Sequence, residues 1–410
     1  MSLDAEMMAM GQRARAAAAI LRTAPADQRS AAISAAATAI RRHAPAILTA
    51  NAANVAAATN LIDRLRLDGG RVEAIALAMA EMAALPDVVG QEMARWTPPN
   101  GLDIARVRTP IGVIGMIYES RPNVTADAAA ICLRSANAVI LRPGSDSLAS
   151  CLAIHAALVE GIVEAGLPAD CVQLIPTADR AAVGLLLGGL GGTIDLIIPR
   201  GGKALVERVS NEARVATLGH LEGICHSYVH ASADLNMALA IVANAKLRRT
   251  SVCGSTETLL VDRAIAPALL PRLADALPGC ELRGDEESRR IAQMIPATDA
   301  DWSTEYLAPI LAVRTVAGLD EAIDHIATYG TGHTDAIIAS DPAAAEQFLD
   351  QVDSAIVMVN ASTQYADGGE FGFGGEIGIA TGKLHARGPV GAEQLTIFKY
   401  KVRGTGQARP

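Results

Sequence analysis

The chain alternates between short apolar runs and longer segments whose apolar residues recur at helical spacing. Runs at 111–118, 138–141, 172–175 and 194–198 predict strands, and the segments 125–135, 145–164, 180–187 and 202–211 predict the helices that follow them. Strands that are apolar throughout and separated by helices are typical of a parallel sheet with helices on both faces. The first half of the chain is therefore predicted to have an open α/β fold.

The same alternation returns after residue 225 and predicts a second α/β unit. The strands are expected at 228–230, 258–261, 310–316, 336–339 and 355–359, and the helices at 235–249, 266–277, 319–329 and 343–352. Before the first unit, the Ala-rich residues 4–57 predict two long surface helices. The Gly-rich segment 367–378 interrupts the pattern, and 393–402 resembles a lone strand. A strand without a following helix is expected to pair elsewhere, here across a subunit interface.

Composition narrows the classes of function. A length of 410 residues is enough for two or three domains, and the net charge of −9, with no basic run, argues against nucleic acid as a partner. The chain has no uninterrupted apolar stretch of membrane-spanning length. It begins with acidic residues where a signal peptide needs basic ones, so we expect a cytoplasmic protein. Six irregularly spaced cysteines form neither a disulfide framework nor a metal motif.

Cys253 is the strongest candidate for a nucleophile. It follows Arg248 and Arg249 and precedes a Gly-Ser-Thr run that lets the backbone approach a ligand. Nearby positive charge favours the reactive thiolate, although a small buried residue at a strand start is the alternative. Cys225 is a rival because His226 is adjacent, but neighbouring residues on a strand point to opposite faces. The others are interpreted as buried small hydrophobes: Cys132, Cys151, Cys171 and Cys280.

Three polar residues could assist a nucleophile. Glu222 ends an apparent strand next to a glycine, where a carboxylate could act as a general base, contact substrate, or simply face solvent. Ser120 and Asn123 lie between a predicted strand and helix and could donate hydrogen bonds to a developing oxyanion. Asn123 could instead cap the helix that follows.

The two common phosphate-binding motifs, GxGxxG and GxxxxGKS, do not occur in this sequence. Two strand ends could still bind phosphate, at 141–145 and at 199–203. Arg142 would emerge at the carboxyl end of its strand and could hold a nucleotide phosphate bidentately. Gly201 and Gly202 stand between Arg200 and Lys203 in the second segment. An exposed loop or surface ion pair is the alternative for both.

Five segments in collinear order resemble the gamma-glutamyl phosphate reductases, a family within the aldehyde dehydrogenase superfamily. They are residues 118–147, 198–209, 220–229, 248–261 and 387–400, and the resemblance extends over about 10–403. It implies an aldehyde-dehydrogenase-like fold with an NADP-binding domain (1–91 and 109–222) and a catalytic domain (223–375). A β-hairpin at 92–108 would pair with the tail at 390–405 for oligomerisation.

The resemblance also implies a reaction, the NADPH-dependent reduction of L-glutamate 5-phosphate to the 5-semialdehyde with release of phosphate. This is the second step of proline biosynthesis, and Cys253 would form a thioester that hydride then reduces. Glu222 falls near the relatives' general base. Ser120 stands at the position of the relatives' oxyanion-binding Asn, with Asn123 as a substitute.

The resemblance also implies a cofactor site and binding partners. NADP(H) would be bound by the residues Arg142, Pro143, Gly144, Ser145, Gly201, Gly202 and Glu305, with no nearby carboxylate to repel a 2′-phosphate. No metal site is expected. Substrate contacts are sought among Arg249, Asn360, His333 and Lys383. A homo-oligomer is expected, and contact with glutamate 5-kinase is conceivable.

Three alternatives remain at this point. A related enzyme could oxidise an aldehyde to its acid without phosphate, with Glu222 as the base. A cysteine acyltransferase or hydrolase would need a histidine next to Cys253, and none lies within 20 residues of it in sequence. A non-catalytic scaffold would not need Cys253 or Arg142.

Overall fold

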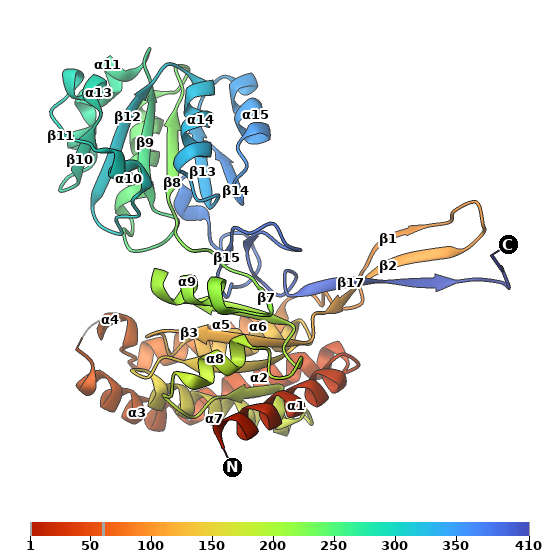
Figure 1. Ribbon diagram of the computed structural model, residues 1–410. Coiled ribbons are helices and arrows are strands. Elements are labelled where there is room, and N and C mark those ends of the chain that lie inside the picture. Colours follow the sequence, from red (N-terminus) through yellow and green to blue (C-terminus); the bar gives the residue numbers. More distant parts are fainter. Residues whose placement is uncertain (1, 60–61, 410) are drawn as a thin grey trace. The chain divides into compact units, whose positions relative to one another are not determined.

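The computed structural model describes residues 2–59 and 62–409, which form two compact units (Figure 1). Unit 1 comprises the chain up to Gly219, Gly372–Gly378 and the part from Leu384 onward. Unit 2 comprises His220–Phe371 and Ile379–Lys383. None of the helices in the described part of the chain combines the length and apolar character that a membrane crossing requires.

Unit 1 is built on a five-stranded parallel sheet in the order β5-β4-β3-β6-β7. Its strands are β3 (Val113–Tyr118), β4 (Ala138–Pro143), β5 (Val172–Leu174), β6 (Leu196–Arg200) and β7 (Ala216–Thr217), with the short β16 (Gly388–Pro389) later in the chain. The helices are α1 (Leu3–Leu21), α2 (Ala26–Arg42), α3 (Ala44–Ala57), α4 (Ile62–Leu65), α5 (Gly69–Ala84), α6 (Val124–Arg134), α7 (Leu148–Glu164), α8 (Ala181–Leu187) and α9 (Lys203–Glu212).

These helices form two groups around the sheet. α6 and α7 pack together and against α2, while α1 contacts α8 and α8 contacts α9. Right-handed crossovers from β3 to β4 to β5, and then back to β6 and β7, place the two groups on opposite faces. The central strands β3 and β4 are buried along their whole length. This explains why they appear in the sequence as continuous apolar runs.

A separate three-stranded sheet extends away from the body of unit 1 (Figure 1). β1 (Glu92–Trp96) and β2 (Asp103–Pro110) form an antiparallel hairpin, and β17 (Thr396–Arg403) pairs antiparallel with β2 from Thr396↔Pro110 to Arg403↔Asp103. The C-terminal strand pairs with this hairpin as expected, but it does so within one chain, so the expectation that it pairs across a subunit interface is wrong. Several of its large apolar side chains are exposed: Met93, Trp96, Ile397, Phe398, Tyr400 and Val402.

Unit 2 contains a seven-stranded parallel sheet in the order β11-β10-β12-β9-β8-β13-β14. The strands are β8 (Cys225–Val229), β9 (Thr256–Asp262), β10 (Glu281–Gly284), β11 (Ile295–Pro296), β12 (Ile310–Val316), β13 (Thr334–Ile338) and β14 (Ile356–Val359), with the short β15 (Ile379–Ala380) later in the chain. The helices are α10 (Leu235–Leu247), α11 (Ala266–Leu269), α12 (Leu273–Ala276), α13 (Glu286–Ile291), α14 (Leu319–Tyr329) and α15 (Pro342–Gln351).

Side chains of consecutive residues on the central strands pack into two different hydrophobic cores. Leu259 packs with Val229 and Val242 on the α10 face, whereas Leu260 packs with Tyr228 and Phe348 on the α14–α15 face. A period of two along a strand produces this division. The predicted α/β fold with helix-covered parallel sheets is confirmed.

Several predicted boundaries are wrong, and proline explains most of them. Residues 4–57 form three helices, because Pro25 precedes α2 and Pro45 opens α3 after a break at His43. The expected helix 266–277 is divided by Pro271 into α11, a 3₁₀ turn and α12. α7 begins at Leu148 instead of residue 145, after a turn in which the Ser147 N–H donates to the Gly144 carbonyl.

Candidate active site

Cys253 lies in the turn that joins α10 to β9, and it is partly exposed. It packs against a small cluster that includes Ala336, Met358 and Ile379. On one side of the turn, the Cys225 thiol donates to the Cys253 carbonyl at 3.1 Å. The turn therefore holds the thiol just after the C-terminus of α10, where it is accessible to a ligand.

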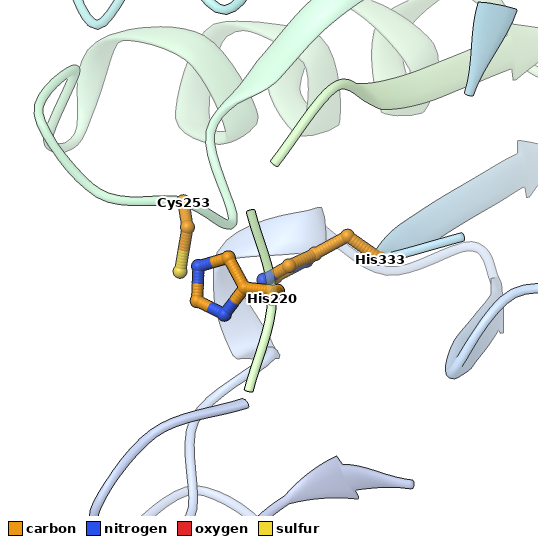
Figure 2. A group of neighbouring side chains, drawn as sticks. All are labelled: His220, Cys253 and His333. Carbon is orange, nitrogen blue, oxygen red and sulfur yellow. The ribbon is translucent and has the colours of Figure 1, made fainter. Parts of the chain in front are cut away.

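Two histidines stand beside the Cys253 thiol (Figure 2). His220 is at the beginning of unit 2, and His333 immediately precedes β13. The sulfur and one ring nitrogen from each histidine lie within 4.8 Å of one another, and the two rings meet edge to face with centroids 4.9 Å apart. The sequence offers His333 as a candidate substrate contact, whereas it does not single out His220.

The tautomer of His220 follows from its hydrogen bond. Its Nδ1 lies 2.7 Å from the carbonyl oxygen of Ile379, which can only accept a hydrogen bond. Nδ1 must therefore carry the hydrogen, and in the neutral ring Nε2 keeps its lone pair. Figure 2 shows one ring nitrogen of His220 pointing toward the Cys253 sulfur. A thiol next to a basic nitrogen whose ring is oriented by a third group is the arrangement of an activated nucleophile.

His333 is fully buried. Its Nδ1 lies 2.9 Å from the Thr334 hydroxyl and 3.5 Å from the Cys225 sulfur. Its Nε2 is buried and has no hydrogen-bond partner among the described residues. A buried nitrogen without a partner costs free energy. The site therefore contains a polar group that the chain itself does not satisfy.

Four of the remaining cysteines are buried as expected, whereas Cys280 is partly exposed like Cys253. Burial acts on the thiols of all five. It raises the pKa of Cys132, Cys151 and Cys225, that of Cys171 to about 12 and that of Cys280 to about 11. A thiol whose pKa lies that high is almost wholly protonated near neutral pH and is a poor nucleophile. Cys225 and His226 do not pair with each other, as predicted: the Cys225 thiol lies by the Cys253 carbonyl and His333, whereas the His226 ring contacts His325 of α14.

The Cys253 turn is anchored by residues that carry no sequence motif. The Gln364 side chain donates to the carbonyls of Ala245 (2.9 Å) and Arg249 (3.2 Å) at the end of α10. Lys246 and Glu257 form a fully buried ion pair that ties α10 to β9 on either side of the turn. In the sequence, each of these two residues is a charged residue within or directly before a largely apolar predicted helix or strand. Their pairing with each other depends on the fold.

Glu222 and Glu305, the two glutamates predicted to belong to the site, lie near one another in unit 2. Glu305 accepts from the Gly223 N–H at 3.0 Å, one residue from the half-buried Glu222. Glu305 was expected to bind the cofactor ribose, and its carboxylate here orders the segment that carries Glu222. The roles of both residues stay predictions.

The remaining substrate candidates lie elsewhere or are engaged. The Asn360 side-chain oxygen accepts from the Ala339 N–H, and its amide nitrogen donates to the Ala339 carbonyl. These two hydrogen bonds join the ends of β13 and β14. Lys383 forms a surface ion pair with Asp353, and Arg249 is exposed after α10. Of the four candidates, the structure places His333 beside Cys253.

In unit 1, Arg142 ends β4 as predicted and is almost buried. Its guanidinium donates to the carbonyls of Pro143 and Ala178, and its Nε has no partner among the described residues. Burial and the neighbouring cations Arg180 and Arg208 lower the pKa of Arg142. Glu119 and Asp179 oppose this effect, so carboxylates as well as cations act on the Arg142 guanidinium, contrary to the expectation of no nearby carboxylate.

The Gly144 segment is held against the end of β3. A β-carbon at Gly144 would stand 2.5 Å from an Asp146 side-chain oxygen and 3.4 Å from the Ser120 backbone nitrogen, so a larger residue here would displace the Asp146 side chain. Asp146 accepts from the buried Ser120 hydroxyl, and Ser120 has a left-handed backbone with φ 44°. Ser145 is exposed. Ser120 is therefore already hydrogen-bonded within unit 1.

Asn123 directly precedes α6, but its side chain does not cap a backbone N–H of that helix. Its amide nitrogen donates to the Asp127 carboxylate at 2.9 Å. Burial raises the pKa of Asp127 to about 6 in spite of this hydrogen bond. Asn123 therefore takes the N-cap position of α6 as expected but lacks the side-chain hydrogen bond of a cap, and the oxyanion roles of Ser120 and Asn123 stay predictions.

In the second segment predicted to bind phosphate, residues 199–203, a backbone N–H already donates to a carboxylate of this chain. Glu119 accepts from the Gly202 N–H at 3.0 Å, at the start of α9. A β-carbon at Gly201 would stand 2.5 Å from the same carboxylate. An anion at this helix N-terminus would therefore have to compete with Glu119.

The chain matches the model of the aldehyde dehydrogenase family over residues 3–301 and 288–400. A gamma-glutamyl phosphate reductase of Caulobacter sp. (strain K31) is 64% identical over 100% of both chains. A second, from Rhodospirillum rubrum, is 60% identical over 98% of this chain and 96% of its own. The crystal structure of the gamma-glutamyl phosphate reductase of Thermotoga maritima superposes with a TM-score of 0.96 at 40% identity, covering 99% of this chain and 100% of its own.

The chain belongs to the gamma-glutamyl phosphate reductases of the aldehyde dehydrogenase family. The resemblance drawn from the five sequence segments is thereby confirmed, as is the aldehyde-dehydrogenase-like fold. Membership makes the chain an oxidoreductase of the aldehyde dehydrogenase type, a family that implies a nicotinamide cofactor.

Proposed function

We propose that the protein reduces L-glutamate 5-phosphate to L-glutamate 5-semialdehyde and phosphate with NADPH, the second step of proline biosynthesis. Full-length relatives at 57–64% identity with the name gamma-glutamyl phosphate reductase support this assignment. The observation that carries the mechanism is the Cys253 thiol beside His220, whose orientation the Ile379 carbonyl fixes.

His220 acts as the general base and then the general acid for the Cys253 thiol. Its Nε2 accepts the thiol proton as the Cys253 sulfur attacks the acyl-phosphate carbonyl carbon. The carbon–oxygen bond to phosphate then breaks, and a glutamyl thioester remains on Cys253. Bound NADPH would supply the hydride that reduces this thioester to the aldehyde level. When the carbon–sulfur bond breaks, the thiolate leaves, and the proton on His220 returns to it.

An oxyanion develops on the substrate carbonyl during both attack and reduction. The backbone N–H of Cys253 is a candidate donor, since an amide beside the nucleophile lies close to the carbonyl under attack. Ser120 and Asn123 are proposed as side-chain donors from unit 1, and Glu222 as a group that contacts substrate. A reductase that releases an aldehyde does not have to activate water against its thioester, so Glu222 need not act as a base.

We assign the 2′-phosphate of NADP to Arg142. Its buried Nε has no partner among the described residues, and Arg180 and Arg208 add positive charge that a dianion would offset, with Glu119 and Asp179 opposing them. Gly144 leaves room for the backbone to approach a ligand. Pro143, Ser145, Gly201, Gly202 and Glu305 are proposed as further cofactor contacts. Unit 1 would then bind NADP and unit 2 would carry the chemistry.

The sheet of β1, β2 and β17 is proposed as the oligomerisation element. Exposed Trp96, Phe398 and Tyr400 pack edge to face along it, which is costly to leave in water. Contact with glutamate 5-kinase stays a prediction.

The test follows the reaction in reverse. The protein is mixed with glutamate 5-semialdehyde, NADP and inorganic phosphate, and the absorbance of the reduced cofactor is recorded. We expect a signal that requires phosphate, disappears in Cys253→Ala and persists in Cys280→Ala, which removes another partly exposed thiol. Equal activity without phosphate would point to aldehyde oxidation with Glu222 as base, and full activity of Cys253→Ala would refute the thioester.

A further inference from the structure

Cys253, His220 and His333 together have the donor atoms of a metal centre. A thiolate and two imidazoles are ligands that Zn²⁺ prefers, and three protein ligands with one open position are common in zinc sites. The three donor atoms already lie within 4.8 Å of one another in unit 2 (Figure 2). Ligand atoms around a tetrahedral zinc are separated by somewhat less, so small side-chain rotations would bring them to bonding distance.

The two histidines are prepared for this role in different ways. His220 places the hydrogen on Nδ1 by bonding the Ile379 carbonyl, which leaves Nε2 as a donor toward a metal. A backbone carbonyl behind the imidazole is the usual outer-shell partner of a metal-bound histidine. His333 is fully buried, and its Nε2 has no partner in the described part of the chain. A metal would satisfy this nitrogen.

We propose that Zn²⁺ binds to Cys253, His220 and His333 and reversibly inhibits the enzyme. Binding releases the thiol proton and forms a sulfur–zinc bond, so the sulfur lone pair that would attack a carbonyl is occupied. Water would take the fourth position. The soft thiolate and two imidazoles favour Zn²⁺ over Mg²⁺ or Ca²⁺, which prefer oxygen ligands.

The binding half of this proposal stands on the side-chain cluster alone, whereas the inhibition half rests on the proposed function. Binding is therefore tested without turnover. Co²⁺ is added to the metal-free protein, without cofactor or substrate, and the absorption spectrum is recorded. We expect one equivalent to give a thiolate-to-cobalt charge-transfer band and the intense visible bands of tetrahedral cobalt. Zn²⁺ should displace it and abolish both.

Variants assign the ligands. Cys253→Ser should lose the charge-transfer band, and His220→Ala, a change at a partly exposed residue, should weaken Zn²⁺ binding by at least about 10-fold. Cys280→Ser, in the same unit, should bind as the unaltered protein does. Circular dichroism of each variant shows whether it is folded. A missing band in the unaltered protein, or a band that survives in Cys253→Ser, would overturn the site.

Inhibition is then measured on the same preparations. Micromolar Zn²⁺ should stop turnover and slow the alkylation of Cys253 by iodoacetamide, and a chelator should restore both. Turnover and alkylation unaffected by saturating Zn²⁺ would overturn the proposal while leaving the reductase assignment intact. Absence of turnover in a preparation that still shows the cobalt band and zinc protection against alkylation would instead count against the proposed function and support the metal site.

Discussion

Gly223 lies directly against the backbone of Cys253. A β-carbon at position 223 would stand 2.2 Å from the Cys253 carbonyl oxygen and 2.9 Å from its Cα. The same carbonyl accepts the hydrogen bond from Cys225, and the Gly223 N–H donates to Glu305. The position of Cys253, the proposed nucleophile, is therefore set by the close approach of two backbone segments, which a side chain would prevent.

Gly223→Ala should displace the nucleophile while leaving the fold intact. The added carbon must push the Cys253 turn away, and a misplacement of about 1 Å can cost about 100-fold in rate. We expect kcat to fall by roughly that factor with little change in the far-ultraviolet circular dichroism spectrum. Gly318→Ala, in the same unit but outside the site, is a suitable control for added bulk, because its β-carbon would meet nothing within 4 Å. Unchanged kcat in Gly223→Ala would show that the turn adapts freely.

His220→Ala should lower the reactivity of the Cys253 thiol. Without the acceptor nitrogen, the thiol must lose its proton to solvent, and a positioned base contributes about 10²- to 10⁴-fold. We expect kcat/KM and the rate of iodoacetamide alkylation to fall together, and the alkylation rate to rise with pH as an unassisted thiol does. His230→Ala, on the same unit but outside the cluster, should react normally. Normal alkylation of His220→Ala would exclude the proton transfer.

Arg142→Ala should change the choice of cofactor. The variant loses the guanidinium that we assign to the 2′-phosphate but keeps every contact that NAD could make. A charge-assisted hydrogen bond contributes about 1.5–3 kcal/mol, so KM for NADP should rise about 10- to 100-fold. KM for NAD should change little, which separates this role from a general loss of structure. An equal rise for both cofactors would place the 2′-phosphate elsewhere.

The sequence was sufficient to predict the alternation of strands and helices because β3, β4 and β9 are buried on both faces and each contains a run of consecutive apolar residues. It also identified Cys253 and Arg142 from their positions at element ends. It did not reveal His220, which is 33 positions before Cys253 and reaches it only because β8 and β9 are neighbours in the sheet. The same holds for Gln364 and for the pairing of Lys246 with Glu257, which depend on tertiary contacts.

The first unit offers a test of packing that does not involve the site. Gly161 in α7 faces α2, and a β-carbon there would stand 2.2 Å from the Ala36 backbone nitrogen. Because backbone cannot yield as a side chain does, Gly161→Ala should destabilise the protein by about 1–3 kcal/mol in urea unfolding. In α8, the β-carbon of Gly184→Ala would meet only the Arg208 guanidinium, at 4.0 Å, so this change should be neutral or stabilise by up to about 1 kcal/mol. Equal stability of the two variants would contradict this packing.

His325 links the stability of unit 2 to pH. It is almost fully buried among the rings of Trp302, His226 and Tyr329, and the Arg314 guanidinium lies 3.2 Å from its Nδ1. Glu321 bonds the far side of that guanidinium. Burial, followed by the neighbouring His226 and Arg314, lowers the pKa of His325 from 6.5 to about 3. The folded state therefore keeps this ring neutral at pH values where the unfolded chain protonates it.

A depressed histidine pKa means that the unfolded state binds the extra proton between about pH 6.5 and 3. Folding stability is therefore complete above pH 6.5 and falls, by up to about 1.4 kcal/mol per pH unit, as the pH drops through this window. His325→Phe removes the titrating group and keeps an aromatic ring, so the variant should gain about 3 kcal/mol relative to the unaltered protein between about pH 7 and 4. Urea unfolding at several pH values measures this difference. Parallel stability curves would show that another group governs the acid limb.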